Sequence, residues 1–194
     1  MPSWRQNKRL GLCLMAAALS AASLPAQTPG AGTAKERANE LTLAGLRPGR
    51  DTRATALARY HKPWGASDEK TAMWRDLCRG RELRVDFGEN DVVESITVSV
   101  MTGPHYDCVS GTAGMPAETW RTGHGLALTE TRERVVAVYG EPDSRGPSTR
   151  QDEETEFLYY AFDWAGSEVP QVLEVTCNQK TGRVVQITLA AQSL

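Results

Sequence analysis

The sequence predicts an α+β protein built from two tandem helix-plus-antiparallel-sheet units. One observation is a pattern that occurs twice at a constant offset of 79 residues: Thr52-Arg53, Tyr60 and Pro63, then Thr131-Arg132, Tyr139 and Pro142. The other is that each copy precedes strand-like runs with similar last members, VESITV at 93–98 and VVQITL at 184–189. A duplicated order of helix and strands is the signature of a repeated supersecondary unit.

The first 26 residues predict an export signal. Basic residues precede an apolar run from Leu10 to Leu24, and small residues lead to a cleavage point after Ala26. Because the run is shorter than the roughly 20 residues of a membrane-spanning helix, we expect cleavage and release into the periplasm or extracellular space. A retained membrane anchor is the alternative. Leu12 stands before Cys13, where a lipidation site needs a small residue, so the sequence disfavours lipidation.

Charge and composition indicate the type of partner and the domain organisation of residues 27–194. Cleavage leaves 19 basic and 24 acidic residues, a net charge of −5, which argues against nucleic acid and allows peripheral membrane contact at most. We expect a flexible leader over 27–40, because no apolar periodicity begins before Leu41. A first unit over 41–101, a linker over 102–123 and a second unit over 124–194 follow.

The first unit opens with a predicted helix that Asp51 or Thr52 caps and Pro63 ends. Three predicted strands come next, over 71–78, 81–87 and 92–100. In the second unit, we expect Thr129 to cap a helix that Gly140 ends. Its predicted strands cover 156–164, 171–178 and 183–190.

Apolar and polar residues alternate along these strands, so each sheet has one apolar face for its helix to cover. The opposite face stays open to solvent or a partner. The segment 157–164 is apolar on both faces, which places aromatic rings on the open side, and exposed aromatic rings are typical binding anchors. The alternative is that both faces are buried, for instance under the linker that carries Trp120. The predicted partner-binding residues are Arg84, Asp86, Phe157, Tyr159, Glu174, Thr176, Gln186 and Thr188.

Three cysteines remain after cleavage. Cys78 ends one predicted strand and Cys108 follows the third, at the same edge of an antiparallel meander, so we predict a disulfide between them. Cys177 would then be unpaired. The alternative is that all three are reduced and buried.

Sequence motifs for catalysis are absent: no nucleophile elbow, zincin helix, phosphate loop or dinucleotide fingerprint occurs. His105 and Cys108 have metal-site spacing, but one pair lacks the three or four ligands that zinc needs. We therefore predict no catalytic residue, no metal site and no cofactor.

The second copy resembles the SmpA/OmlA superfamily. The resemblance lies in Gly125-Leu126, Leu128-Thr129, Val135, Tyr139-Gly140 and Pro142, followed by strands and then Gly182, Val184 and Ile187. The superfamily includes the small lipoprotein of the β-barrel assembly machinery and the β-lactamase inhibitory protein. The latter is similar in carrying two tandem units. The resemblance implies a binding module outside the cytoplasm without a cofactor.

We therefore expect a non-catalytic, exported module that recognises a protein partner through open sheet faces, as an enzyme inhibitor or an envelope scaffold. The alternative is a small-ligand carrier or enzyme with a cleft between the two units. A histidine hydrogen-bonded to an acid or a cysteine in that cleft would favour this alternative. A purely structural domain is a third possibility.

Overall fold

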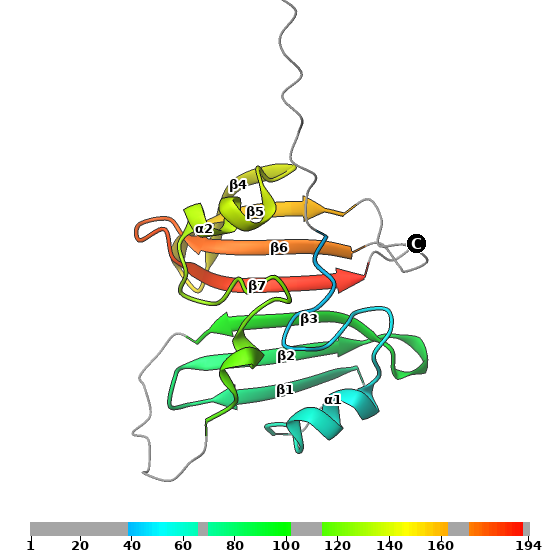
Figure 1. Ribbon diagram of the computed structural model, residues 1–194. Helices are drawn as coiled ribbons and strands as arrows, with labels where there is room; N and C mark the ends of the chain where they lie inside the picture. The colour runs from blue at the N-terminus through cyan, green and yellow to red at the C-terminus, as the bar shows by residue number, and fades with distance from the viewer. Residues whose placement is uncertain (1–38, 66–69, 102–113, 163–170, 192–194) are drawn as a thin grey trace, which may run out of the picture. The chain divides into compact units, whose positions relative to one another are not determined.

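Seven strands form one antiparallel sheet in the computed structural model, which describes residues 39–65, 70–101, 114–162 and 171–191 (Figure 1). The spatial order is β1-β2-β3-β7-β6-β5-β4. The strands are β1 (Thr71–Asp76), β2 (Arg81–Phe87), β3 (Val93–Val100), β4 (Ser144–Arg150), β5 (Glu153–Ala161), β6 (Gln171–Asn178) and β7 (Val184–Ala191).

The prediction of two helix-plus-sheet units is wrong, because β3 and β7 pair at the centre and make the sheet continuous. Their register joins Val98 to Ile187 and Ile96 to Leu189. The described chain is mainly β, with two short helices. The physical reason is that a separate three-stranded sheet would expose the unpaired N–H and C=O groups of its last strand. Pairing β3 with β7 satisfies both edges at once.

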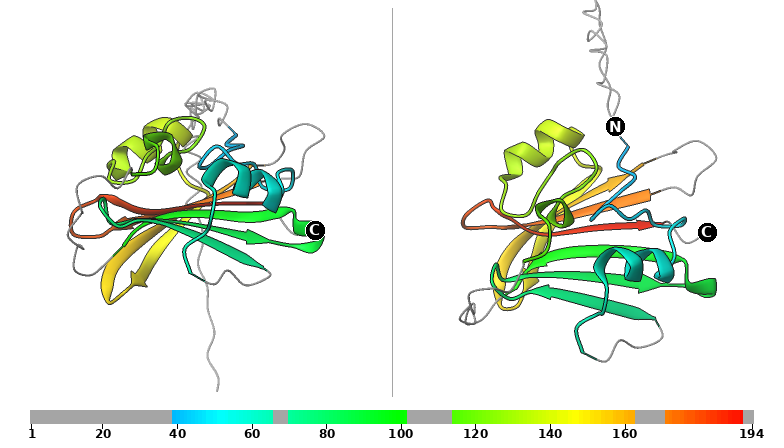
Figure 2. Two further views of the ribbon diagram at one scale, coloured as in Figure 1. Left: turned by 90° about the horizontal axis from the view of Figure 1, so that it is seen from below. Right: turned by 60° about the horizontal axis from the view of Figure 1, so that its bottom comes forward.

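Both helices, α1 (Arg53–Tyr60) and α2 (Arg132–Tyr139), lie on the same face of the sheet (Figure 2). Thr52 caps α1 as predicted, and its hydroxyl accepts from the Thr55 backbone N–H. We call this side the helix face and the opposite side the open face.

The predicted cap of α2 is wrong by two residues. Thr131, not Thr129, caps the helix, since the Thr131 hydroxyl accepts from the Arg134 backbone N–H at 3.4 Å. Gly140 ends the helix with a positive φ of 79°, a conformation that glycine adopts without strain. Its predicted place at the helix end is confirmed.

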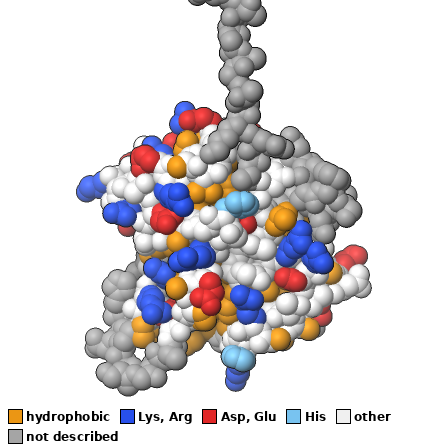
Figure 3. Space-filling model, in the orientation of Figure 1, with side chains coloured by type: hydrophobic (Ala, Val, Ile, Leu, Met, Phe, Trp, Pro, Cys, Tyr) orange, Lys and Arg blue, Asp and Glu red, His pale blue; other side chains and the backbone are white. Residues whose placement is uncertain are grey.

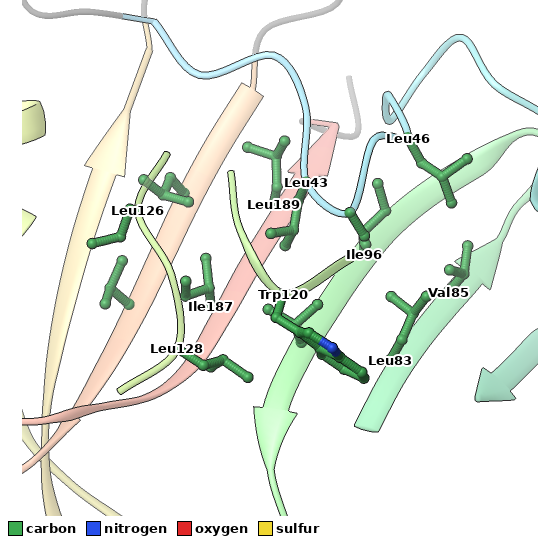
Figure 4. Close-up of a cluster of buried hydrophobic side chains, with 14 of the residues drawn as sticks. Leu43, Leu46, Leu83, Val85, Ile96, Trp120, Leu126, Leu128, Ile187 and Leu189 are labelled. Atoms are coloured by element: carbon green, nitrogen blue, oxygen red, sulfur yellow. The ribbon is translucent and has the colours of Figure 1, made fainter. Parts of the chain in front are cut away.

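The helices cover little of the helix face. From α1 only Ala56 is buried, and from α2 only Val135 and Tyr139. The centre of the sheet is instead covered by irregular segments that precede the helices (Figure 4). Their buried side chains are Leu43, Leu46, Trp120, Leu126 and Leu128, each at most 2% exposed.

Trp120 therefore belongs to the core, although it lies within the predicted linker. It is the last residue of a 3-10 helix, Ala117–Trp120, and packs on the helix face beside Leu83 and Leu128 (Figure 4). The described part of the predicted linker, 114–123, is thus packed structure. Because Trp120 lies on the helix face, it does not cover the aromatic rings of the open face.

Strand β4 was not predicted. Its sequence, SRGPSTR, has no apolar alternation and contains Gly146 and Pro147. Proline lacks a backbone donor and is confined in sheets to edge strands or strand starts, and β4 is an edge strand. The strand propensity of these residues therefore does not predict β4. The strand forms because its backbone pairs with β5.

Candidate functional site

The open face carries three rows of side chains that run across the sheet. The strand registers define them as Ser144, Tyr159, Glu174, Thr188, Thr97, Arg84 and Met73; Gly146, Phe157, Thr176, Gln186, Ser99, Glu82 and Arg75; and Ala161, Val172, Ala190, Ser95, Asp86 and Thr71. All eight predicted partner-binding residues fall within these rows. Their side chains thus lie on one face of one sheet, although the prediction placed them on two.

The aromatic pair of the open face is half-buried rather than fully buried or fully exposed. Phe157 and Tyr159 each have intermediate exposure, and their ring centroids are 6.4 Å apart. Neither the predicted exposed anchor nor the alternative, burial on both faces, describes them fully. Each half-buried ring keeps some apolar surface in contact with water, and a bound partner can bury that surface.

The open face is concave because the β4–β5 hairpin bends over it. Arg150 of β4 donates from Nε to Oε1 of Gln186 on β7 at 3.1 Å. In a flat sheet, β4 and β7 would be three strand spacings, about 14 Å, apart, which is beyond this contact. Figure 2 shows β4 and β5, in yellow, bending away from the helices.

Polar side chains on the β1–β2–β3 half of the open face are paired with one another. Arg75 pairs with Glu82 at 2.7 Å, and Arg84 pairs with Asp86 at 2.9 Å. The second oxygen of Asp86 accepts from Ser95 at 2.8 Å. This half is therefore electrically balanced without a partner.

Glu174 differs from these residues. It has intermediate exposure and makes no hydrogen bond or ion pair with any residue that the structure describes. Burial raises the pKa of its carboxyl above the ordinary glutamate value. Its row neighbours are Tyr159 on β5 and Thr188 on β7, so neither neighbour in the row is a basic residue.

A second cluster, which the sequence did not reveal, lies on the helix face around Glu40. The Glu40 side chain is 1% exposed. One oxygen accepts from three backbone N–H groups, those of Leu41, Thr42 and Gly123, each at 3.0 Å. Glu40, which the prediction placed in the flexible leader, is therefore held in the packed structure.

The other Glu40 oxygen binds the α2 region. It accepts from the Tyr139 hydroxyl at 2.7 Å and from the His124 backbone N–H at 3.0 Å, and it lies 2.9 Å from His124 Nδ1. Burial raises the pKa of Glu40, but hydrogen bonds from Tyr139, Thr42 and His124 outweigh it, so the net direction is down. Burial also raises the pKa of the Tyr139 hydroxyl.

Glu40 and His124 form the acid–histidine contact that would favour an enzyme. Figure 3 looks onto this face and shows histidine side chains at its surface, and the His124 side chain is 42% exposed. The Glu40 carboxylate, however, already receives its full complement of donors. It joins the segment before α1 to the loop before α2, which is a structural role.

A hollow of about 420 Å³ lies at the C-terminal end of α1. Tyr60, Trp64 and Trp74 supply aromatic walls, and Arg59 and Lys62 are basic residues of its lining that make no ion pair with a described carboxylate. The hollow lies beside α1 rather than between the two halves of the chain. In the region between the two halves, over β3 and β7, the core side chains described above fill the helix face.

The two described cysteines differ in oxidation state. Cys78 is disulfide-bonded, which excludes the alternative that all three are reduced. Cys177 is free and buried in β6, and burial raises the pKa of its thiol to about 11. The predicted partner of Cys78, Cys108, lies outside the described residues, so that pairing stays a prediction.

Across 39–65, 70–101, 114–162 and 171–191, no three histidine, cysteine or acidic side chains gather as metal ligands would. In the same ranges, no helix has the length and apolarity to span a bilayer.

Comparisons with known proteins give one distant structural similarity. No family model matches the chain, and no curated protein matches it. The chain is similar to a solved structure of a DUF4309 family protein, YjgB, from Bacillus subtilis subsp. subtilis strain 168. The two share 12% sequence identity and a TM-score of 0.46, over 79% of this chain and 88% of that one. No match supports the resemblance to the SmpA/OmlA superfamily.

Proposed function

We propose that the protein is a non-catalytic recognition module that binds a protein partner through its concave open face. One observation carries the proposal: the eight residues predicted to bind a partner lie in three adjacent rows of one face that neither described helix covers, and only Thr176 among them is buried. Phe157 and Tyr159 supply apolar contact area, and the polar rows around them fix the orientation of the partner by hydrogen bonding.

The curvature supports a protein segment as the ligand. The β4–β5 hairpin reaches β7 through the Arg150–Gln186 hydrogen bond, so a loop or strand of a partner can contact the hairpin and the exposed part of the sheet together. We further propose that this recognition takes place after export. The predicted signal over residues 1–26 lies outside the described residues and supports this location from sequence alone.

Site-specific photo-crosslinking tests the proposal. A photoreactive amino acid is placed at Thr188 on the open face and, as the matched control, at Leu57, which is 37% exposed on α1. Expression in the source organism is expected to give a protein adduct from position 188 and none of the same mass from position 57. Equal adducts from both positions, or none from position 188, would exclude the open face as the binding surface.

The small-ligand alternative has one specific observation in its favour, the aromatic and basic hollow beside α1. Its basic residues Arg59 and Lys62, of which Arg59 lies over the Tyr60 ring, would suit an anion with an apolar ring. Line broadening of the Trp64 indole resonance on titration with indole-3-acetate, absent in Lys62→Ala, would support this function. An unchanged spectrum would count against it.

A further inference from the structure

We propose that the protein partner inserts a lysine or arginine side chain beside Glu174, where the cation contacts the carboxylate and the rings of Phe157 and Tyr159. This inference rests on the proposed function and names the chemistry that the open face selects. It follows from the distribution of charge over the face rather than from any single side chain.

The charge distribution is uneven. The three rows contain five charged residues, and four of them form the pairs Arg75–Glu82 and Arg84–Asp86. Glu174, on the other half of the face, is the fifth and has no polar partner among the described residues. The nearby cation on β4, Arg150, donates to Gln186 rather than to Glu174.

A partner that covers the open face must compensate this carboxylate. Removing an unpaired carboxylate from water costs several kcal/mol, because no group replaces the lost hydration. An apolar partner surface would carry this cost in full. A cationic side chain removes it by forming a charge-assisted hydrogen bond.

The rings next to Glu174 favour an organic cation over a metal ion. Tyr159 is directly opposite Glu174 in the register, and Phe157 is its diagonal neighbour, within about 8 Å. Aromatic faces attract ammonium and guanidinium groups. A single carboxylate flanked by rings lacks the additional oxygen ligands that calcium or magnesium requires.

A random peptide library tests the inference. Dodecapeptides displayed on phage are selected against the protein expressed from its full-length sequence, and enriched peptides are synthesised for calorimetry. We expect them to share one basic position. Replacing that residue by glutamine should weaken binding to the wild type by about tenfold, and binding to Glu174→Gln by much less.

Two further variants separate failure of the inference from failure of the proposed function. Tyr159→Ala should weaken every selected peptide, whereas Glu154→Gln makes the same charge change at an exposed residue outside the three rows and should weaken none. Peptides that are sensitive to Tyr159→Ala but not to Glu174→Gln would overturn the inference and leave the proposed function standing. Peptides insensitive to both, or no enrichment at all, would count against both proposals.

Discussion

Thr97 of β3 and Thr188 of β7 face each other at the centre of the sheet, with their hydroxyl oxygens 3.0 Å apart. They are the matching residues of the two similar segments, 93–98 and 184–189. The two strands with similar sequences therefore pair with each other, instead of each ending a separate sheet.

Because β3 pairs with β7, we expect one cooperative unfolding transition. Neither half can separate without breaking the central ladder and exposing the core over it. Tryptophan fluorescence, which reports on the buried Trp74 and Trp120, and far-ultraviolet circular dichroism should give the same midpoint in urea. Two resolved midpoints would show that the halves unfold independently.

Glu40→Gln should lower the free energy of unfolding by about 3 kcal/mol. The amide keeps the size of the side chain but turns one acceptor into a donor, which then faces groups that themselves donate to Glu40. Urea unfolding at neutral pH measures the change. Glu154→Gln, the same substitution at an exposed position, is the control and should change stability by less than about 0.5 kcal/mol.

Glu40 should also make the protein sensitive to acid. The pKa of its carboxyl is lowered in the folded state, so its contribution to stability is present above the ordinary value of 4.5 and is lost as pH falls through the lowered value. The stability difference between wild type and Glu40→Gln should therefore shrink below pH 4.5. A difference that stays constant down to pH 2 would contradict the ionised hydrogen-bonded carboxylate.

Glu174→Gln should have the opposite effect and raise the midpoint of thermal unfolding at neutral pH. Burial raises the pKa of Glu174, so the ionised form weakens the folded state as pH rises from 4.5 through the raised value. Its row neighbours, Tyr159 and Thr188, are not basic residues, and Glu154→Gln again serves as the control. The gain should disappear below pH 4.5. A lower midpoint for the variant at neutral pH would show that Glu174 is already paired.

Thiol counting should find one free cysteine in the chain that remains after the proposed cleavage at residue 26. Under native conditions even this thiol should react slowly, because Cys177 is buried and its pKa is raised to about 11. Denaturation should release one equivalent. Three equivalents would exclude the disulfide at Cys78, and mass spectrometry of the non-reduced digest identifies its partner.

The candidate site was predictable in part, because strand periodicity is local. Alternation along a strand decides which side chains share a face, and it correctly grouped Phe157 with Tyr159, and Glu174 with Thr176. Alternation does not show that two groups of strands share one face, since this depends on which edges pair. The sequence also gave no indication that Glu174 would be left without a partner while Arg84 and Asp86 pair.

By itself the sequence determined the local features: the Thr52 cap, the glycine at the end of α2, and the strands whose apolar and polar residues alternate. These depend on interactions between residues close in the chain. The tertiary structure alone decided the continuous sheet, the edge strand β4, the burial of Trp120 and the hydrogen bonds that join Glu40 to residues more than 80 positions away. Those features depend on contacts across long stretches of chain, for which neither propensity nor periodicity carries information.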